Sequence, residues 1–305
     1  MKNDPSFRKG IIFALAGFSI WGFLPLYWSL LHAITPMHIL ALRILLSLVL
    51  LGSILALNKN FLWLTVFKDV KKGGMIILAS LVLCVNWGVY LWAVTQGRNI
   101  EASLGYYMNP LVSIVLGLIF FREKLSALQW TAFGCACLGV LILTLLSGAL
   151  PWISVTLAVC FGLYGLIKKK VKLSSLESLT AETLAAVPLG VILLFLRIET
   201  AASLPRLCLD WHNASYIAQL GAPVLIPLVF IGAISSLPLY CFGQGAKLLP
   251  LSTLGFTQFL APTIQFFLGV FFFKEYFPIH YVAAFTFIWL AAILYVVSLR
   301  RLASR

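Results

Sequence analysis

The chain has 305 residues, of which 62% are hydrophobic and 10% charged, and its mean hydropathy is +1.03. Soluble domains carry about 25% charged residues, so this composition excludes an ordinary soluble domain. The net charge of +13 does not indicate a nucleic-acid binder, because the basic residues stand at the ends of apolar runs. Most of the six cysteines lie inside such runs and are read as small hydrophobic residues rather than as a disulfide framework or metal site.

Apolar runs in chain order predict ten membrane-spanning helices, because a helix needs about 20 mostly apolar residues to cross about 30 Å of hydrocarbon. Charges and turn-forming residues bound these runs, and the connections leave little room for a domain outside the membrane. The sequence therefore predicts an all-α integral membrane protein. Its helices are expected at 10–33, 37–57, 73–95, 101–121, 128–146, 151–169, 178–197, 221–243, 251–273 and 279–298.

The distribution of basic residues predicts the orientation of the chain. With the N-terminus in the cytoplasm, 17 of the 22 Lys and Arg residues fall in cytoplasmic segments, and Arg43 alone lies within a helix. Cytoplasmic loops of membrane proteins are enriched in Lys and Arg, so both termini are expected in the cytoplasm. The polar start precedes an apolar run without a cleavage site, so no removable signal peptide is expected.

Self-comparison predicts two copies of a five-helix unit, residues 1–148 and 149–305. Near the start of each copy, Trp21-Gly22 stand opposite Tyr164-Gly165. Because five is odd, the second copy enters the membrane in the opposite orientation, as in many secondary transporters with a site between the repeats. At an offset of 152 the matches are Pro110 with Pro262, Gly117 with Gly269, Phe120-Phe121 with Phe272-Phe273, Arg122 with Lys274, and Glu123 with Glu275. The two glutamates are expected to be solvated or to form structural ion pairs with adjacent basic residues.

Several aromatic and amide side chains are predicted at membrane depth. Trp21 lies about 16 Å into the first helix, although Trp usually favours the membrane interfaces. It either stacks on substrate in a cavity or packs between helices. Asn86 and Tyr90 share one helix face, with Trp87 beside them. An intramembrane Asn needs a partner, which is either a polar cavity or another helix.

The repeated helices carry a second group of candidate binding residues. Tyr107 and Pro110 share one stripe of the fourth helix, and Asn109 lies on the neighbouring stripe. Pro110 and Pro262 each free a backbone carbonyl within a helix, which can support a binding site or produce a plain kink. In the second half, the predicted lining continues with Tyr164, Tyr240, Gln244 and Gln258.

Three ionisable residues are candidates for structural or gating roles. Arg43, a further candidate for substrate binding, costs about 2.5 to 3.5 kcal/mol near the bilayer centre and should pair or face a water-filled cavity. Topology places Glu182 roughly 15 Å away in depth, so Glu101 is the preferred partner. Alternatively, Glu101 is stabilised by the dipole of its own helix, since it lies in the first turn.

Residues 86–130, NWGVYLWAVTQGRNIEASLGYYMNPLVSIVLGLIFFREKLSALQW, resemble the RarD family of the EamA, or drug/metabolite transporter, superfamily. The resemblance extends through WGFLPLYW (21–28), the helix with Arg43, and LPLSTLGFTQFLAPT (249–263). It implies a ten-helix permease of the inner membrane and a link to chloramphenicol sensitivity; relatives in the superfamily export amino acids and other metabolites. The family has His-Arg where this chain has Leu42-Arg43, which weakens any proton-relay role there.

The leading hypothesis is a secondary transporter that exports or equilibrates small metabolites, such as amino acids or amphipathic drug-like compounds, by alternating access. No catalytic residue, metal or cofactor is expected, because the chain has no phosphate-binding loop, H-E-x-x-H or G-x-S-x-G motif. An uncoupled facilitative channel and a membrane sensor or scaffold remain alternatives. The expected partners are a small-molecule substrate and membrane lipids, without nucleic acid, and a monomer is compatible with the sequence.

Overall fold

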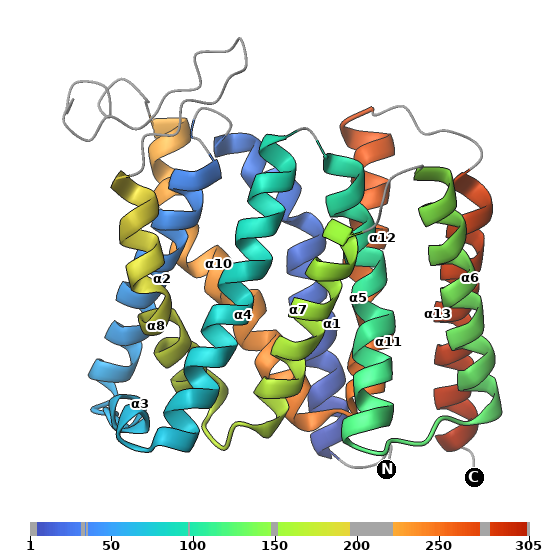
Figure 1. Cartoon of the computed structure of the whole chain (residues 1–305), viewed down its shortest axis with the longest axis horizontal. Helices are drawn as coiled ribbons and strands as arrows, with labels where there is room; N and C mark the ends of the chain where they lie inside the picture. Colours follow the sequence, from blue (N-terminus) through green and yellow to red (C-terminus); the bar gives the residue numbers. More distant parts are fainter. Residues whose placement is uncertain are drawn as a thin grey trace. The chain divides into compact units, whose positions relative to one another are not determined.

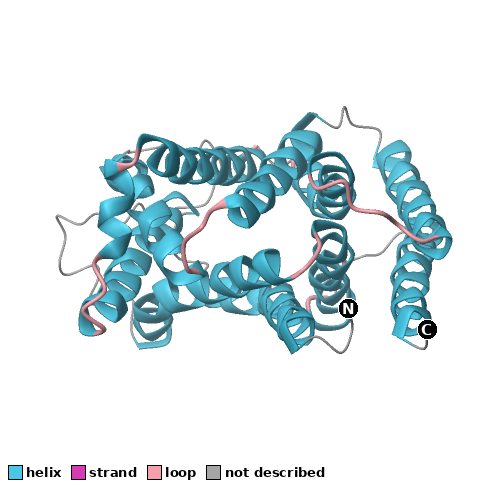
Figure 2. Ribbon diagram, turned by 90° about the horizontal axis from the view of Figure 1, so that it is seen from below, coloured by secondary structure: helices cyan, strands magenta, loops and turns pink. Residues whose placement is uncertain are grey.

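A computed structural model describes residues 5–31, 34, 36–96, 98–147, 152–195, 222–274 and 281–303. Within these ranges every regular element is a helix (Figure 2). The main helices are α1 (Pro5–Trp28), α2 (Pro36–Leu57), α3 (Leu62–Thr65), α4 (Val70–Thr95), α5 (Asn99–Phe120), α6 (Ala127–Ser147), α7 (Trp152–Lys170), α8 (Ser175–Phe195), α10 (Ala222–Leu248), α11 (Leu251–Gln258), α12 (Leu260–Phe267) and α13 (Tyr281–Ala303) (Figure 1).

Ten helical stretches in the described residues are long and apolar enough to cross a membrane, which confirms the predicted all-α fold and its ten spans. Differences of five residues from the predicted bounds include the start of the first helix, the end of the eighth and the end of the tenth, which continues to Ala303 rather than 298. The first begins at Pro5 rather than 10, and the eighth continues to Leu248 rather than 243. Pro is favourable at the first helical position, and Lys247 at a helix C-terminus is favoured by the dipole, so both helices continue through polar residues.

The chain divides into two compact units, each of which combines segments from both halves of the sequence. The first unit comprises Met1–Phe23, Val85–Lys170 and Cys241–Arg305, and the second comprises Leu24–Cys84 and Val171–Tyr240. The predicted repeat boundary at residue 148 falls outside the described residues and stays a prediction.

The second unit is held together by packing of α2 against α8 and by hydrogen bonds to α10 from α2 and the end of α1. The Ser47 hydroxyl donates a hydrogen bond to the Gly232 carbonyl at 3.2 Å, and the Tyr27 hydroxyl donates to the Pro227 carbonyl. A Cβ atom at Gly232 would lie 2.6 Å from the Leu46 backbone, so only glycine permits this close approach of α10 to α2.

In the first unit, α5 packs against α7 and α11, and α6 packs against α13 (Figure 1). The crossing of α5 and α11 is one of several close approaches among these helices. A Cβ atom at Gly255 would lie 2.9 Å from the Pro110 carbonyl oxygen. The two helices of the predicted repeats that carry the matched prolines are therefore in direct backbone contact.

The matched residues Arg122 and Lys274 have the same unusual backbone conformation. Their φ angles are 51° and 53°, in the left-handed region that residues other than glycine seldom adopt. Arg122 follows α5, and Lys274 follows the π-helix η3 (Leu268–Phe272) that continues α12. The similarity at an offset of 152 thus extends from sequence to backbone geometry.

Glu123, the next residue, caps the start of α11. Its Oε1 accepts a hydrogen bond from the Leu251 N–H at 2.6 Å, and its Oε2 accepts from the N–H and hydroxyl of Ser252 at 2.8 and 2.6 Å. The Lys169 ammonium lies 3.9 Å from Oε1. The expected structural role is present, but its partners are a helix N-terminus and a distant Lys rather than the adjacent basic residues. A carboxylate here satisfies two free N–H groups and interacts favourably with the helix dipole. Glu275, its counterpart, lies outside the described residues.

Replacing Glu123→Gln should lower the apparent melting temperature of the purified protein. The neutral amide cannot accept all three bonds with the same strength, and capping interactions contribute about 0.5 to 2 kcal/mol. Lys124→Gln is the matched control, since Lys124 is exposed and adjacent. Equal melting of the two variants and the wild-type protein would show that the cap does not stabilise the fold.

Candidate functional site

The helical hydrogen bonding of the ninth membrane span, here called the broken span, is interrupted near its middle, although Phe259 keeps helical angles (φ −61°, ψ −15°). Helix α11 ends at Gln258, Phe259 forms a turn, and α12 begins at Leu260. Pro262 has no N–H, so the Gln258 carbonyl loses its normal helical donor, which accounts for a break at this point. In the first half α5 runs without interruption through Pro110. The two prolines matched in sequence therefore differ in outcome: Pro262 accompanies a discontinuous helix, whereas Pro110 lies within a continuous one.

An aromatic cluster formed by α1, α7 and α10 surrounds Trp21. The Trp21 ring lies 5.5 Å from Phe18, 5.7 Å from Phe161 and 5.9 Å from Phe242, between ring centroids. Tyr164 is fully buried and stacks on Phe242 at 5.8 Å. The structure thus shows Trp21 and Tyr164 packing between helices, one of the two alternatives for Trp21. Their contact with substrate stays a prediction.

A hydrogen bond connects this cluster to the broken span. The Gln265 side-chain amide in α12 donates to the Trp21 carbonyl at 3.0 Å. On the α5 side, the Tyr107 hydroxyl donates to the Pro262 carbonyl at 3.2 Å. The segment that follows the break is therefore held by side-chain hydrogen bonds to both α1 and α5.

Two buried amide oxygens on α5 and α11 have no hydrogen-bond partner among the described residues. They are Oδ1 of Asn109 and Oε1 of Gln258, whose side chains are 6% and 4% exposed. The Gln258 Nε2 donates to the Ser113 hydroxyl at 2.8 Å. Ser113 lies four residues after Asn109, on the same face of α5. Gln258, the last residue of α11 before the break, is thus bonded to the α5 residue one helical turn after Asn109.

Two of the predicted residues of α4 contact neighbouring helices, Asn86 on α7 and Tyr90 on α5. The Asn86 side-chain amide donates to the Leu157 carbonyl at 2.9 Å, so the helix–helix hydrogen bond that the sequence left open is present. The Tyr90 ring lies 5.8 Å from Tyr106, and Tyr90 is 36% exposed. Trp87 is half-buried. A role for these residues in lining a substrate cavity stays a prediction.

The predicted pair of Arg43 and Glu101 is not tested by the structure, since Arg43 belongs to the second unit and Glu101 to the first. The Glu101 carboxylate lies 3.5 Å from Arg98 Nε, three residues earlier. Its backbone carbonyl accepts a hydrogen bond from the Ser154 hydroxyl at 2.6 Å. Glu101 therefore has a local ion pair at the start of α5, consistent with the first-turn role considered above.

The other acids in the described part of the chain have structural partners. Glu182 is buried and accepts a hydrogen bond from Ser178 at 2.5 Å. Glu177 forms a capping box at the start of α8. Asp69 caps α4, and hydrogen bonds from Lys72, first from its backbone N–H and then from its side chain, lower the pKa of this carboxyl. None of these acids lies among the residues around the broken span.

Tyr240 and Gln244 are half-buried in α10. Tyr240 falls in the second unit and Gln244 in the first. The structure thus brings together only some of the predicted binding residues, namely Trp21 and Tyr164 in the aromatic cluster, and Tyr107, Asn109, Pro110, Gln258 and Pro262 at the broken span.

Sequence reasoning missed Ser113 and Phe242 as parts of this site. Ser113 could have been found, because its spacing of four from Asn109 places both on one helix face. Phe242 carries no signal that distinguishes it from the other 22 phenylalanines.

Comparisons with known proteins agree on one family. Residues 8–145 match the EamA-like transporter family. Protein RarD of Streptomyces exfoliatus is 38% identical over 96% of this chain and 90% of that protein. A Pseudomonas aeruginosa protein named chloramphenicol-sensitive protein RarD is 26% identical over 94% and 93% of the two chains. A solved crystal structure with 16% identity covers 96% of this chain and 98% of its own at a TM-score of 0.69, which shows a shared fold.

Replacing Asn86→Leu should distinguish the two roles of this residue. Loss of the bond to Leu157 should lower the apparent melting temperature modestly, because interhelical hydrogen bonds in membranes contribute about 0.6 kcal/mol on average. Tyr90→Phe, which keeps the ring on the same helix face, is the comparison. Unchanged melting with lost ligand binding would instead assign Asn86 to a cavity lining.

Proposed function

This chain belongs to the RarD family of EamA-like transporters, and from that premise we propose that it is a secondary transporter of small amphipathic metabolites. It works in the bacterial inner membrane, with both termini in the cytoplasm and alternating access between its two repeats. Transport by the family supports this function, and the ten apolar helices support the membrane location.

The observation that carries the choice of substrate is the pair of unpartnered oxygens on Asn109 and Gln258. A buried acceptor without a donor costs about 1 to 3 kcal/mol, so a native structure that keeps two of them requires an explanation. A substrate with an N–H or ammonium group supplies the missing donors. The proposed solute therefore carries a hydrogen-bond donor at one end.

The aromatic cluster supports an apolar or aromatic part in the same solute. Trp21 is only half-buried, and the Gln265 side chain ties its backbone to the segment after the break. A proline inside a membrane helix removes the donor of one backbone carbonyl, here that of Gln258, and such a carbonyl can face a ligand. An amino acid with an apolar side chain has both features. Chloramphenicol, which the name of one relative links to sensitivity, has an amide N–H and an aromatic ring.

Phenylalanine should raise the apparent melting temperature of the purified protein, whereas 3-phenylpropionate, which lacks only the ammonium group, should not. A ligand that binds only the folded state stabilises it in proportion to its occupancy. A thermal-shift titration of both compounds, with chloramphenicol as a third ligand, measures this difference. Equal stabilisation by the two analogues would remove the donor requirement from the proposal.

Asn109→Ala and Trp21→Ala should each weaken phenylalanine uptake into proteoliposomes. A hydrogen bond to a charged group contributes about 1.5 to 3 kcal/mol, so the first change should reduce apparent affinity by at least about tenfold. Loss of an aromatic contact of about 0.5 to 1.5 kcal/mol predicts a reduction of roughly two- to tenfold for the second.

Trp130→Ala is the control, since Trp130 is 50% exposed and contacts Phe133 outside the cluster. Uptake that is insensitive to an imposed proton gradient would indicate facilitated, uncoupled transport. A well-folded protein that moves none of these solutes would favour a sensor or scaffold.

A further inference from the structure

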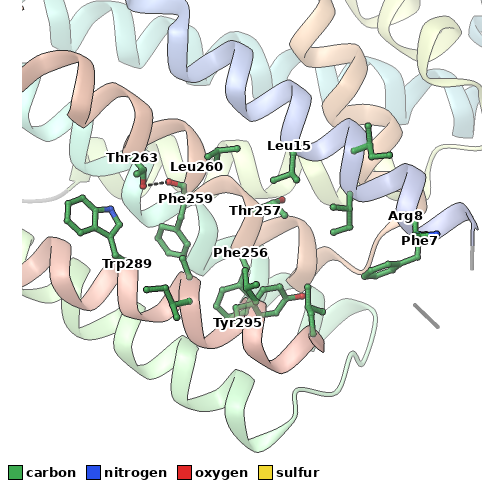
Figure 3. Close-up of a pocket in the computed structure, with 16 residues that line it drawn as sticks. Phe7, Arg8, Leu15, Phe256, Thr257, Phe259, Leu260, Thr263, Trp289 and Tyr295 are labelled. Atoms are coloured by element: carbon green, nitrogen blue, oxygen red, sulfur yellow. Dashed lines mark hydrogen bonds between the residues drawn. The ribbon is translucent and has the colours of Figure 1, made fainter. Parts of the chain in front are cut away.

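An apolar groove of about 900 Å³ lies between α1, the broken span and α13 (Figure 3). None of the predicted binding residues lines it. Its walls include Ile12, Leu15, Ile293 and Val296, whose side chains are 41% to 67% exposed. In a membrane-spanning protein, such exposed apolar side chains face hydrocarbon rather than water. The groove is therefore a recess that lipid chains can enter.

The two ends of the groove differ in chemistry. One end is lined by Arg8, which is exposed and has no ion pair with a carboxylate among the described residues. The other end is formed by Trp289, whose ring is stacked on Phe267 at 5.7 Å with an interplanar angle of 3°. In Figure 3 Arg8 and Trp289 lie at opposite ends of the set of lining residues. The groove thus has a cationic mouth and an aromatic inner end.

The length of the groove matches one leaflet of a bilayer. Trp289 and Leu299 both line it and are ten residues apart on α13, a rise of about 15 Å. The hydrocarbon core of a bilayer is about 30 Å thick, so half of it is about 15 Å. An acyl chain that follows the groove from Arg8 would reach the bilayer centre near Trp289.

We propose that this groove is a specific site for one anionic membrane phospholipid, with its phosphate at Arg8 and one acyl chain along α13. Arginine binds phosphate oxygens through charge-assisted, often bidentate hydrogen bonds. Charge complementarity selects an anionic headgroup, and the apolar walls retain the chain. This inference requires only a membrane location and does not depend on which solute the protein moves.

The rival occupant is an amphipathic solute that enters from the side. The Trp289 indole N–H is buried and has no partner in the described part of the chain, so it could donate to such a solute. A hydrocarbon chain makes no use of this donor. Trp289→Phe keeps an aromatic ring, removes the N–H and so distinguishes the two occupants.

Native mass spectrometry of the purified protein, with phosphatidylglycerol and phosphatidylethanolamine of identical acyl chains, tests the proposal. The wild-type protein should retain one phosphatidylglycerol with about fivefold preference, since a basic residue near an anionic lipid contributes about 1 kcal/mol. Arg8→Gln should reduce this preference to near parity. Ala292→Trp should displace both lipids by filling the groove, while Trp289→Phe should leave lipid binding unchanged.

Two control variants and a competition arm complete the experiment. Lys9→Gln removes the adjacent charge, and Leu290→Phe enlarges an exposed α13 side chain; neither residue lines the groove. Both should bind lipid as the wild-type protein does, and melting curves should show that all variants are folded. Inorganic phosphate at millimolar concentration should not compete. Retained preference in Arg8→Gln, displacement by phosphate alone, or loss of lipid in Trp289→Phe would overturn the proposal.

Discussion

The structure depends on one constraint, which is that backbone N–H and C=O groups in hydrocarbon must find partners within the protein. Continuous helices meet it by themselves, and the break at Phe259 meets it with help. The Phe259 carbonyl keeps its ordinary helical bond from the Thr263 N–H and accepts a second hydrogen bond from the Thr263 hydroxyl. Upstream, the Glu123 carboxylate satisfies the free N–H groups at the start of α11. The start of α11 thus obtains its partners from a side chain, whereas the carbonyl that loses its helical donor to Pro262 is that of Gln258.

Because of the same constraint, buried polar atoms without hydrogen-bond partners require an explanation. Asn109 and Gln258 each keep a buried oxygen unsatisfied, although neighbouring side chains such as Ser113 and Gln265 form hydrogen bonds. These two atoms lie on α5 and α11, and the described residues hold other unsatisfied buried polar atoms elsewhere, among them Ser175 Oγ, Ser235 Oγ and Trp289 Nε1. Unsatisfied buried acceptors lower the stability of the protein alone. They are typical of a binding site, where a ligand supplies the missing hydrogen-bond donors.

The sequence predicted the helices well because hydropathy reports how much chain the hydrocarbon requires. It also identified Pro262 and the repeat that matches Arg122 with Lys274. It did not predict that only Pro262 would accompany a break, because proline has the same local effect in both helices. Nor did it predict the Glu123 cap, whose partners are 128 and 129 residues away. Periodicity specifies which face of a helix is polar, whereas long-range packing decides which other residue that face contacts.

The Glu123 cap also has a consequence for biosynthesis. The carboxylate leaves the ribosome with the first four membrane spans, but the first of the N–H groups it binds follows 128 residues later. At about 5 to 20 residues per second, this delay is roughly 6 to 26 seconds. Throughout that interval the turn after α5 exists without its permanent partner. The first half of the chain must therefore remain in the membrane without this contact until α11 is inserted.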